Sequence, residues 1–163
     1  MPSESDVRAW FAAHVPEGWF AGPPEVEIDG DEILVAGQLP AEGTAGAAGN
    51  EARIARFREA SREQRMRIAE DGQRKFRRKV SWSVTAGDLK QSFTTLSMPV
   101  MTRLRQPERQ VLDTLIAAGV ARSRSEALNW CVRLVAEKQA EWLKDLKSAL
   151  EAVEKARAKG PTP

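Results

Sequence analysis

The sequence predicts an α+β protein with a mixed amino-terminal part and a mostly helical carboxy-terminal part. Apolar residues recur at helical spacing in some segments and alternate every second residue in others. Charge is uneven too: residues 1–50 hold nine acidic residues and one arginine, a formal charge of −8, whereas the whole chain carries +2. We therefore expect an acidic region beside a basic working surface. The predicted parts are an α+β module (1–96), a dimerising unit (97–137), and an amphipathic helix with a frayed tail (138–163).

The chain is expected to begin with a helix and a hairpin. Ser3 or Ser5 can cap the helix, and Pro16 with Gly18 ends it. Residues 25–37 read as two strands joined by a turn at Asp29-Gly30-Asp31. The apolar positions that share the expected helix face are Val7, Trp10, Phe11 and His14.

A basic helix is expected in the middle of the amino-terminal module. Residues 38–50 are rich in glycine and alanine and read as a loop, whereas residues 51–76 read as one long helix. Residues 51–80 hold eleven basic and five acidic side chains. Either they add salt-dependent affinity for nucleic acid, or the arginines pair with the acidic first 50 residues. The candidate accessory DNA contacts are Arg74, Lys75, Arg77, Arg78 and Lys79.

Two further strands are expected before the pattern changes. Residues 80–85 alternate in polarity and read as a strand, Gly87-Asp88 supplies a turn, and residues 91–96 read as a second strand. These strands complete the predicted α+β module of residues 1–96.

From Met98 onward we predict a strand, a helix, a turn and a second helix. Pro107 suits the first turn of a helix, and Gly119 suits the position just after its end. Ser123 with Glu126 forms the pattern of a capping box. Alternate strand residues face opposite ways, so two sets are expected. Val100, Thr102 and Leu104 face inward, and Met101, Arg103 and Arg105 face outward.

This unit needs a second copy of itself. One strand cannot close a sheet, and two short helices cannot enclose a core. We expect the strands of two chains to pair antiparallel across a two-fold axis, with four helices packed against them. The residues expected in the dimer core are Leu104, Leu112, Leu115, Leu128 and Val132.

Residues 97–137 resemble the ribbon-helix-helix proteins of the CopG-like and Arc-like class. The resemblance rests on Thr102-Arg103-Leu104, on Leu112-Asp113-x-Leu115 followed by Gly119, and on the run from Arg122 to Leu128 ending in Val132-Arg133. It implies that the outward strand face enters the major groove of double-stranded DNA. Met101, Arg103 and Arg105 would then contact bases, Arg103 first, since arginine can fork onto guanine O6 and N7.

The same resemblance implies a phosphate clamp at the start of the second helix. Its free backbone N–H groups and its dipole suit a phosphate oxygen. Ser123, Arg124 and Ser125 would contact the DNA backbone and set the register. Ordinary helix capping at Ser123 is the competing interpretation, and the two can coexist.

The last helix carries a short coiled-coil pattern. Leu143, Leu146, Leu150 and Val153 follow the 3-4-3 spacing of an a/d seam. The helix can pack within the dimer, pack on the amino-terminal module, or bind another protein through residues 138–158.

Enzyme and metal chemistry find little support in the sequence. His14 and Cys131 are single residues of their type, so neither a zinc set nor an internal disulfide can form from them. No glycine-rich phosphate loop precedes a helix. We expect no catalytic residues, metal or cofactor. No apolar run approaches the ~20 residues that span a bilayer, and the amino terminus lacks the layout of a signal peptide, so we expect a cytoplasmic, nucleoid-associated protein without membrane contact.

The leading functional prediction is a dimeric, sequence-specific DNA-binding transcriptional regulator, acting as a repressor, alone or as a row of dimers. Two other interpretations stay open. In one, an antitoxin-like protein dimerises through residues 97–137 and grips a protein partner with residues 138–158. In the other, a nucleoid-coating protein binds DNA with weak sequence preference.

Overall fold

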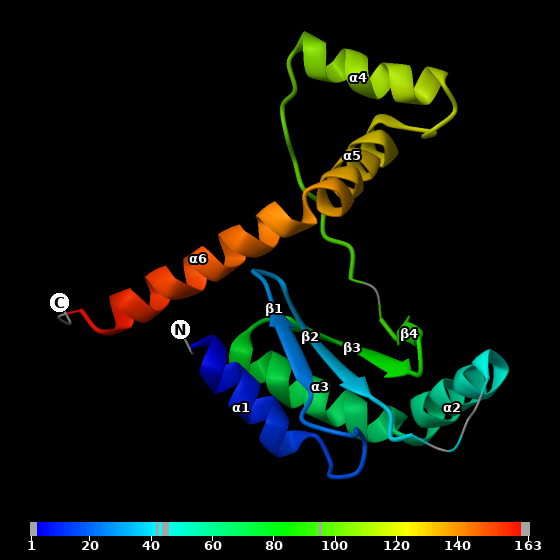
Figure 1. The fold of residues 1–163 in the computed structure, drawn as a ribbon, viewed down its shortest axis with the longest axis vertical. Helices are drawn as coiled ribbons and strands as arrows, with labels where there is room; N and C mark the ends of the chain where they lie inside the picture. Colours follow the sequence, from blue (N-terminus) through cyan, green and yellow to red (C-terminus); the bar gives the residue numbers. More distant parts are fainter. Residues whose placement is uncertain (1–2, 42, 44–45, 95, 161–163) are drawn as a thin grey trace. The chain divides into compact units, whose positions relative to one another are not determined.

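The computed structural model describes residues 3–41, 43, 46–94 and 96–160, without the side chain of Glu154. The described residues form six helices and one four-stranded sheet, which confirms the predicted α+β class (Figure 1). The chain divides into two compact units, residues 1–99 and residues 100–163. Each unit is described by itself below. The predicted frayed end at 161–163 lies outside the described residues.

The first helix, α1 (Glu4–His14), confirms the expected cap. The Ser3 hydroxyl accepts a hydrogen bond from the Asp6 N–H at 3.2 Å, and the Asp6 carboxylate accepts one from the Ser3 N–H at 2.9 Å. This reciprocal pair satisfies two donors that a helix start leaves free. Val7 and Phe11 are fully buried and Trp10 is half-buried, so these three positions of the predicted face point into the core, whereas His14 is exposed.

The predicted hairpin is also confirmed. Strands β1 (Glu25–Ile28) and β2 (Glu32–Gln38) pair antiparallel, with Ile28 opposite Ile33. In the turn, the Asp29 carboxylate accepts the N–H groups of Asp31 and Glu32 at 2.8 and 2.7 Å. Local acceptance of backbone N–H groups is the reason that aspartate favours such turns.

The prediction of one helix over residues 51–76 is wrong. Two helices, α2 (Ala47–Ala60) and α3 (Arg62–Phe76), meet at Ser61, and α2 takes in residues 47–50 that were expected in a loop. The Ser61 hydroxyl donates to the Phe57 carbonyl at 2.5 Å and accepts from Arg65 Nε at 2.8 Å. A serine side chain that bonds the preceding turn competes with the regular helical ladder, which explains the break.

The two helices connect parallel strands. Strand β3 (Lys79–Ala86) pairs parallel with β2, so the α2–α3 segment is the crossover that a parallel pair requires. Strand β4 (Leu89–Ser92) follows the Gly87-Asp88 turn and pairs antiparallel with β3. The predicted strand at 91–96 is therefore misplaced, because a two-residue turn between Ala86 and Leu89 fixes an earlier start. The sheet order is β1-β2-β3-β4.

Unit 1 has a substantial core. Helices α1 and α3 lie against the sheet, and α2 packs on β3 and β4 (Figure 1). Gly37 is required on β2 because a Cβ there would lie 2.3 Å from the Phe20 ring. The buried residues form two adjoining clusters: Val7, Phe11, Val26, Ile33, Val35, Ile68, Phe76 and Trp82 in one, and Phe20, Leu39, Ile54, Val84 and Ala86 in the other.

Unit 2 is helical. It contains α4 (Gln106–Ala117), α5 (Arg124–Lys138) and α6 (Ala140–Ala158). Pro107 stands in the first turn of α4, as predicted. Gly119 follows the end of α4 with φ +75°, and the Val120 N–H returns to the Leu115 carbonyl at 2.9 Å. This is the Schellman ending for which glycine is favoured.

Candidate nucleic-acid interface

The segment before α4, residues 100–105, is exposed. Val100 and Met101 are 86% and 95% exposed, and Arg103 and Arg105 are exposed as well. Leu104 is half-buried and packs against the unit 2 core, so this position faces inward as expected. In the single chain the segment forms no strand, and Val100 and Thr102 are exposed rather than inward. Among the described residues, no strand pairs with this segment.

The unit 2 core is small. Three residues are buried, Leu112, Ala121 and Ala127, and two of them are alanines. Of the predicted dimer-core residues, Leu112 is buried, Leu104, Leu115 and Leu128 are half-buried, and Val132 is 61% exposed. A single copy of the unit therefore leaves much of its apolar surface in water.

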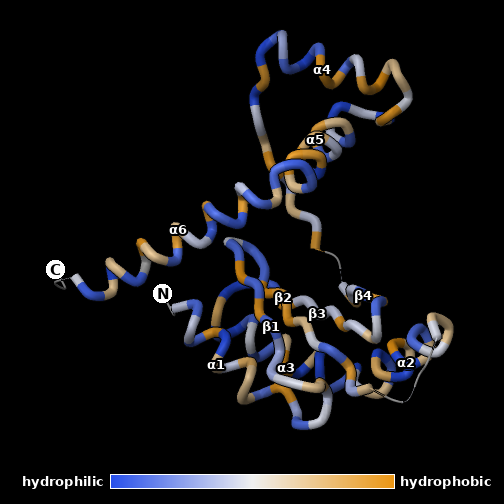
Figure 2. Tube along the Cα trace, viewed as in Figure 1, coloured by the Kyte–Doolittle hydropathy of each residue, from blue (hydrophilic) through white to orange (hydrophobic). Residues whose placement is uncertain are grey.

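Both α5 and α6 carry exposed apolar side chains. Figure 2 shows apolar stretches recurring along both helices. Val132, Leu134 and Val135 are exposed on α5. The predicted seam of α6 is exposed throughout, together with a tryptophan beside it: Trp142, Leu143, Leu146, Leu150 and Val153. Exposed apolar side chains that share one helix face, as Leu143, Leu146, Leu150 and Val153 do, mark protein contacts more often than isolated apolar residues do.

The start of α5 is pre-organised. The Ser123 hydroxyl accepts from the Glu126 N–H at 3.2 Å, as expected of a cap. The other half of the predicted capping box differs, because the Glu126 carboxylate accepts from the Arg122 N–H at 2.9 Å. Hydrogen bonds from this N–H and from the Arg122 side chain lower the pKa of Glu126. The N–H groups of Arg124 and Ser125 lie in the first turn of α5, where no carbonyl of the helix can accept their hydrogen bonds.

Sequence reasoning missed the partner of Arg124. Its guanidinium donates Nε and Nη2 to the two carboxylate oxygens of Asp113, both at 2.8 Å, and links α5 to α4. The hydrogen bond from Arg124 lowers the pKa of Asp113, and the same contact raises the pKa of Arg124. Asp113 and Arg124 are 11 residues apart, and only the turn at Gly119 brings them together. Asp113 thus orients the residue that was predicted to contact phosphate.

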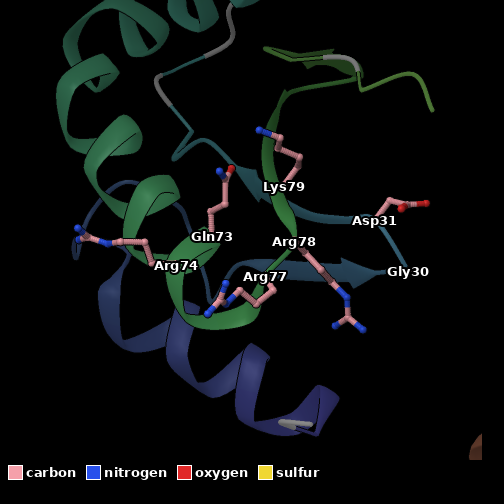
Figure 3. A pocket seen from close by; sticks show the side chains of 7 residues that line it. All are labelled: Gly30, Asp31, Gln73, Arg74, Arg77, Arg78 and Lys79. Atoms are coloured by element: carbon pink, nitrogen blue, oxygen red, sulfur yellow. The ribbon is translucent and has the colours of Figure 1, made fainter. Parts of the chain in front are cut away.

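The predicted accessory contacts lie at the junction of α3 and β3. Arg74, Arg77, Arg78 and Lys79 line an open hollow of ≈ 670 Å³ with Gly30, Asp31 and Gln73 (Figure 3). Lys75 lies apart from them: its ammonium stands 5.9 Å from the centre of a Trp10 ring and 5.8 Å from that of Phe76. Arg74 pairs with Asp71, and Arg67 with Glu63, so these arginines bond acids of their own helix.

The residues that other chemistries would use are placed as follows. His14 Nδ1 lies 2.7 Å from the Trp10 carbonyl, and its ring stacks on Trp10 at 3.8 Å. Cys131 is half-buried beside the unit 2 core. Among the described residues, histidine, cysteine and carboxylate side chains do not gather in threes to hold a metal ion. In the described part of the chain, every helix is too short or too polar to cross a bilayer.

Comparison with known proteins gives a consistent result over both units. Residues 5–92 match the model of the Rv1265-like protein, N-terminal domain, and residues 105–157 match the Mb1296 C-terminal domain. Over 167 aligned residues the chain is 51% identical to Rv1265 of Mycobacterium tuberculosis and to Mb1296 of Mycobacterium bovis, both uncharacterized proteins. The alignment covers 99% of this chain and 73% of each relative. No solved structure matches the chain.

These matches correct one prediction. The expected membership of residues 97–137 in the ribbon-helix-helix class is wrong, because the family model that matches this region is the Mb1296 C-terminal domain. The motifs behind that expectation are a short strand-like triplet at residues 102–104, a pair of leucines before a helix-ending glycine, and a serine-capped helix start, which other helical pairs can share. The roles predicted for individual residues stand as predictions from charge, exposure and position alone.

Proposed function

The chain belongs to the Rv1265-like protein family, and we propose that it is a dimeric, sequence-specific DNA-binding regulator that contacts DNA through unit 2. The observation that carries the proposal is the exposed basic segment, residues 100–105, next to a helix pair whose core is incomplete in one copy. We call residues 100–105 the basic segment below. A protein acting in this way is nucleoid-associated.

The incomplete core calls for a second copy. Val132 and Val135 lie one turn apart on α5, on the same side as half-buried Leu128 and Cys131. A two-fold axis places this face against its own equivalent, since an isologous contact uses one surface twice. Burial of these two faces, one from each chain, supplies the apolar area that Leu112, Ala121 and Ala127 lack.

The same axis gives the basic segment a mate. An extended edge presents N–H and C=O groups that can bond a second strand. The Leu104 carbonyl already accepts from the Arg109 guanidinium at 2.7 Å, so the groups proposed to pair are those of residues 100–103. Two segments paired antiparallel make a ribbon of the width that the DNA major groove accepts, about 12 Å. Leu104 then stays on the helix side, and Met101, Arg103 and Arg105 share the opposite side. Arginine is the residue best suited to guanine, through a forked contact to O6 and N7.

The start of α5 would hold the DNA backbone. The Ser123 hydroxyl proton and the Arg124 and Ser125 N–H groups are donors directed out of the helix end. Asp113 fixes the Arg124 guanidinium by two bonds of 2.8 Å. Arg124 therefore contributes mainly by position and by its backbone N–H, whereas Ser125 has an exposed side chain to offer. Backbone contacts of this kind set the register for Arg103.

The direct test is selection of genomic DNA fragments by the purified full-length chain at about 50 and 200 mM salt. We expect a discrete set of fragments to survive the higher salt. Arg103→Ala should weaken binding to these fragments by about 1–3 kcal/mol and relax base choice at one position of each half-site. Arg157→Ala, which removes an exposed arginine at the end of α6, is the matched control and should keep the selection.

Other outcomes would contradict the proposal in identifiable ways. Retention of all fragments alike, with a steep salt slope, would indicate a nucleoid-coating protein. If the protein does not bind DNA but binds a second protein in a fixed ratio through the exposed seam of α6, it would be an antitoxin-like component. If the Arg103→Ala variant binds the selected fragments as tightly as the wild type does, Arg103 does not recognise a base.

A further inference from the structure

The end of α3 contains an arginine where glycine is expected. Arg77 follows the last helical residue and has φ +58°, the left-handed conformation. Within the described residues it is the one residue other than glycine with positive φ. Glycine is the usual residue at this position because a Cβ makes the conformation unfavourable. A strained arginine that glycine would replace at no conformational cost points to a use for its side chain.

Three cations at this junction have no bonded partner. Among the described residues, the side chains of Arg77, Arg78 and Lys79 make no hydrogen bond or ion pair, whereas Arg74 bonds Asp71 and Lys75 lies on Trp10. Hydrogen bonds from the backbone N–H groups of Asp31 and Glu32 lower the pKa of the Asp29 carboxyl, and the charge of Arg78 lowers it a little further. However, the Asp29 carboxylate is already occupied by two backbone N–H groups of its turn.

The geometry of the hollow excludes some ligands. Its lining contains no aromatic ring and no Val, Leu, Ile or Met side chain, so it lacks the apolar surface on which an acyl chain would pack. Figure 3 shows the long side chains of Arg77, Arg78 and Lys79 spreading in different directions, while the Asp31 carboxylate points away from Arg77 and Lys79. Charges spread in this way match a row of anionic groups better than they match one compact anion.

We propose that this surface of unit 1, formed by Arg77, Arg78 and Lys79, binds consecutive phosphate groups of a DNA backbone. We call it the Arg77 surface. Duplex DNA presents a phosphate every 3.4 Å of rise on each strand, which suits cations spread around an open hollow. The inference rests on the proposed function for its ligand, and it gives unit 1 a sequence-independent share of the binding. Unit 2 would choose the sequence, and the Arg77 surface would add affinity.

The test uses full-length protein and two DNA duplexes, one selected from the genome and one of random sequence. The variant Arg77→Gly removes the side chain and suits the left-handed backbone, so its melting temperature should be unchanged or higher. Its salt slope, d log K/d log[salt], should become shallower by about 0.9 for each phosphate contact removed, on both duplexes alike. A triple variant with Arg78→Gln and Lys79→Gln should lose about three times as much. Lys90→Gln, an exposed charge on β4 opposite Thr85, is the control and should change nothing.

The outcomes separate this inference from the proposed function. If unit 2 selects no sequence, the salt slope on the random duplex, compared between wild type and the variants, still tests the Arg77 surface. Wild-type slopes in the triple variant on both duplexes would overturn the inference while leaving sequence selection intact. Calorimetric titration with inorganic pyrophosphate is the last arm. Pyrophosphate binding that Arg77→Gly abolishes, with unchanged DNA binding, would also overturn it and assign the surface to a free phosphate compound.

Discussion

Replacement of Val132 by aspartate is the sharpest test of the proposed dimer contact through α5. In one chain the Val132 side chain is 61% exposed, so a charge there should cost the single unit little, about 0.5 kcal/mol or less. Full burial of a valine stabilises by about 1.5–3 kcal/mol, and the 61% that a partner would cover corresponds to about 1–2 kcal/mol per chain. The two-fold axis uses the residue twice, so its loss weakens the dimer by about 2–4 kcal/mol. That is a roughly 30-fold to several-hundred-fold rise in dissociation constant.

Aspartate adds the cost of enclosing two unpaired charges, so Val132→Asp should be a monomer at micromolar concentration. Sedimentation equilibrium measures this directly, and circular dichroism checks that the helices remain. The matched control is Arg133→Asp, which also introduces an aspartate at an exposed position of the same helix but on a side turned away from Leu128, Cys131 and Val135, and which should remain a dimer. An unchanged dimer in Val132→Asp would refute the reasoning, and so would a wild-type chain that sediments as a monomer.

Three further predictions concern unit 2. Leu112→Ala should lower its free energy of unfolding by about 2–5 kcal/mol in urea denaturation, because the side chain is 4% exposed at the centre of a small core; a loss under 1 kcal/mol would contradict that placement. Gly119→Ala should cost about 1–2 kcal/mol in the same assay, since an L-residue is forced to φ +75°. The pKa of Asp113 and of Glu126 is lowered in the folded chain, so their stabilisation is present above the ordinary values of 3.8 and 4.5 and is lost as pH falls through the folded pKa values. The melting temperature should therefore stay constant above about pH 5 and fall below about pH 4. The fall should be smaller in Asp113→Asn. An equal fall in this variant would show that the Asp113–Arg124 pair does not cause the pH dependence.

The sequence predicted an element correctly where a single residue type supplies the hydrogen bond or the φ angle that the backbone requires at that position. Ser3 caps α1, the Asp29 turn closes the hairpin, and Gly119 ends α4, because each satisfies N–H or φ requirements within a few residues. Pro107 started α4 for the same reason. Such requirements are local, so a pattern of neighbours is enough to reveal them.

Local sequence patterns could not predict the features that depend on contacts between distant parts of the chain. The Arg65 guanidinium, which donates to the Ser61 hydroxyl at the helix break, also lies 4.6 Å from the centre of the Phe93 ring, a contact between residues far apart in the sequence. The parallel pairing of β2 with β3 depends on where the whole α2–α3 crossover returns the chain. In the candidate site, the inward position of Leu104 was predicted by alternation, but the exposure of Val100 and Thr102 was not, and the bond between Asp113 and Arg124 needed the fold of the turn. The left-handed backbone of Arg77 has no signature in residue type at all.

Guanine protection by the bound protein tests the central claim most directly. Dimethyl sulfate methylates guanine N7 in the major groove, where a forked arginine blocks it. On a selected fragment, we expect wild-type protein to protect symmetry-related guanines, one set in each half-site. Arg103→Ala should lose protection at one guanine of each set and keep the remainder of the footprint. A wild-type footprint without N7 protection, or protection that survives the loss of Arg103, would contradict the account.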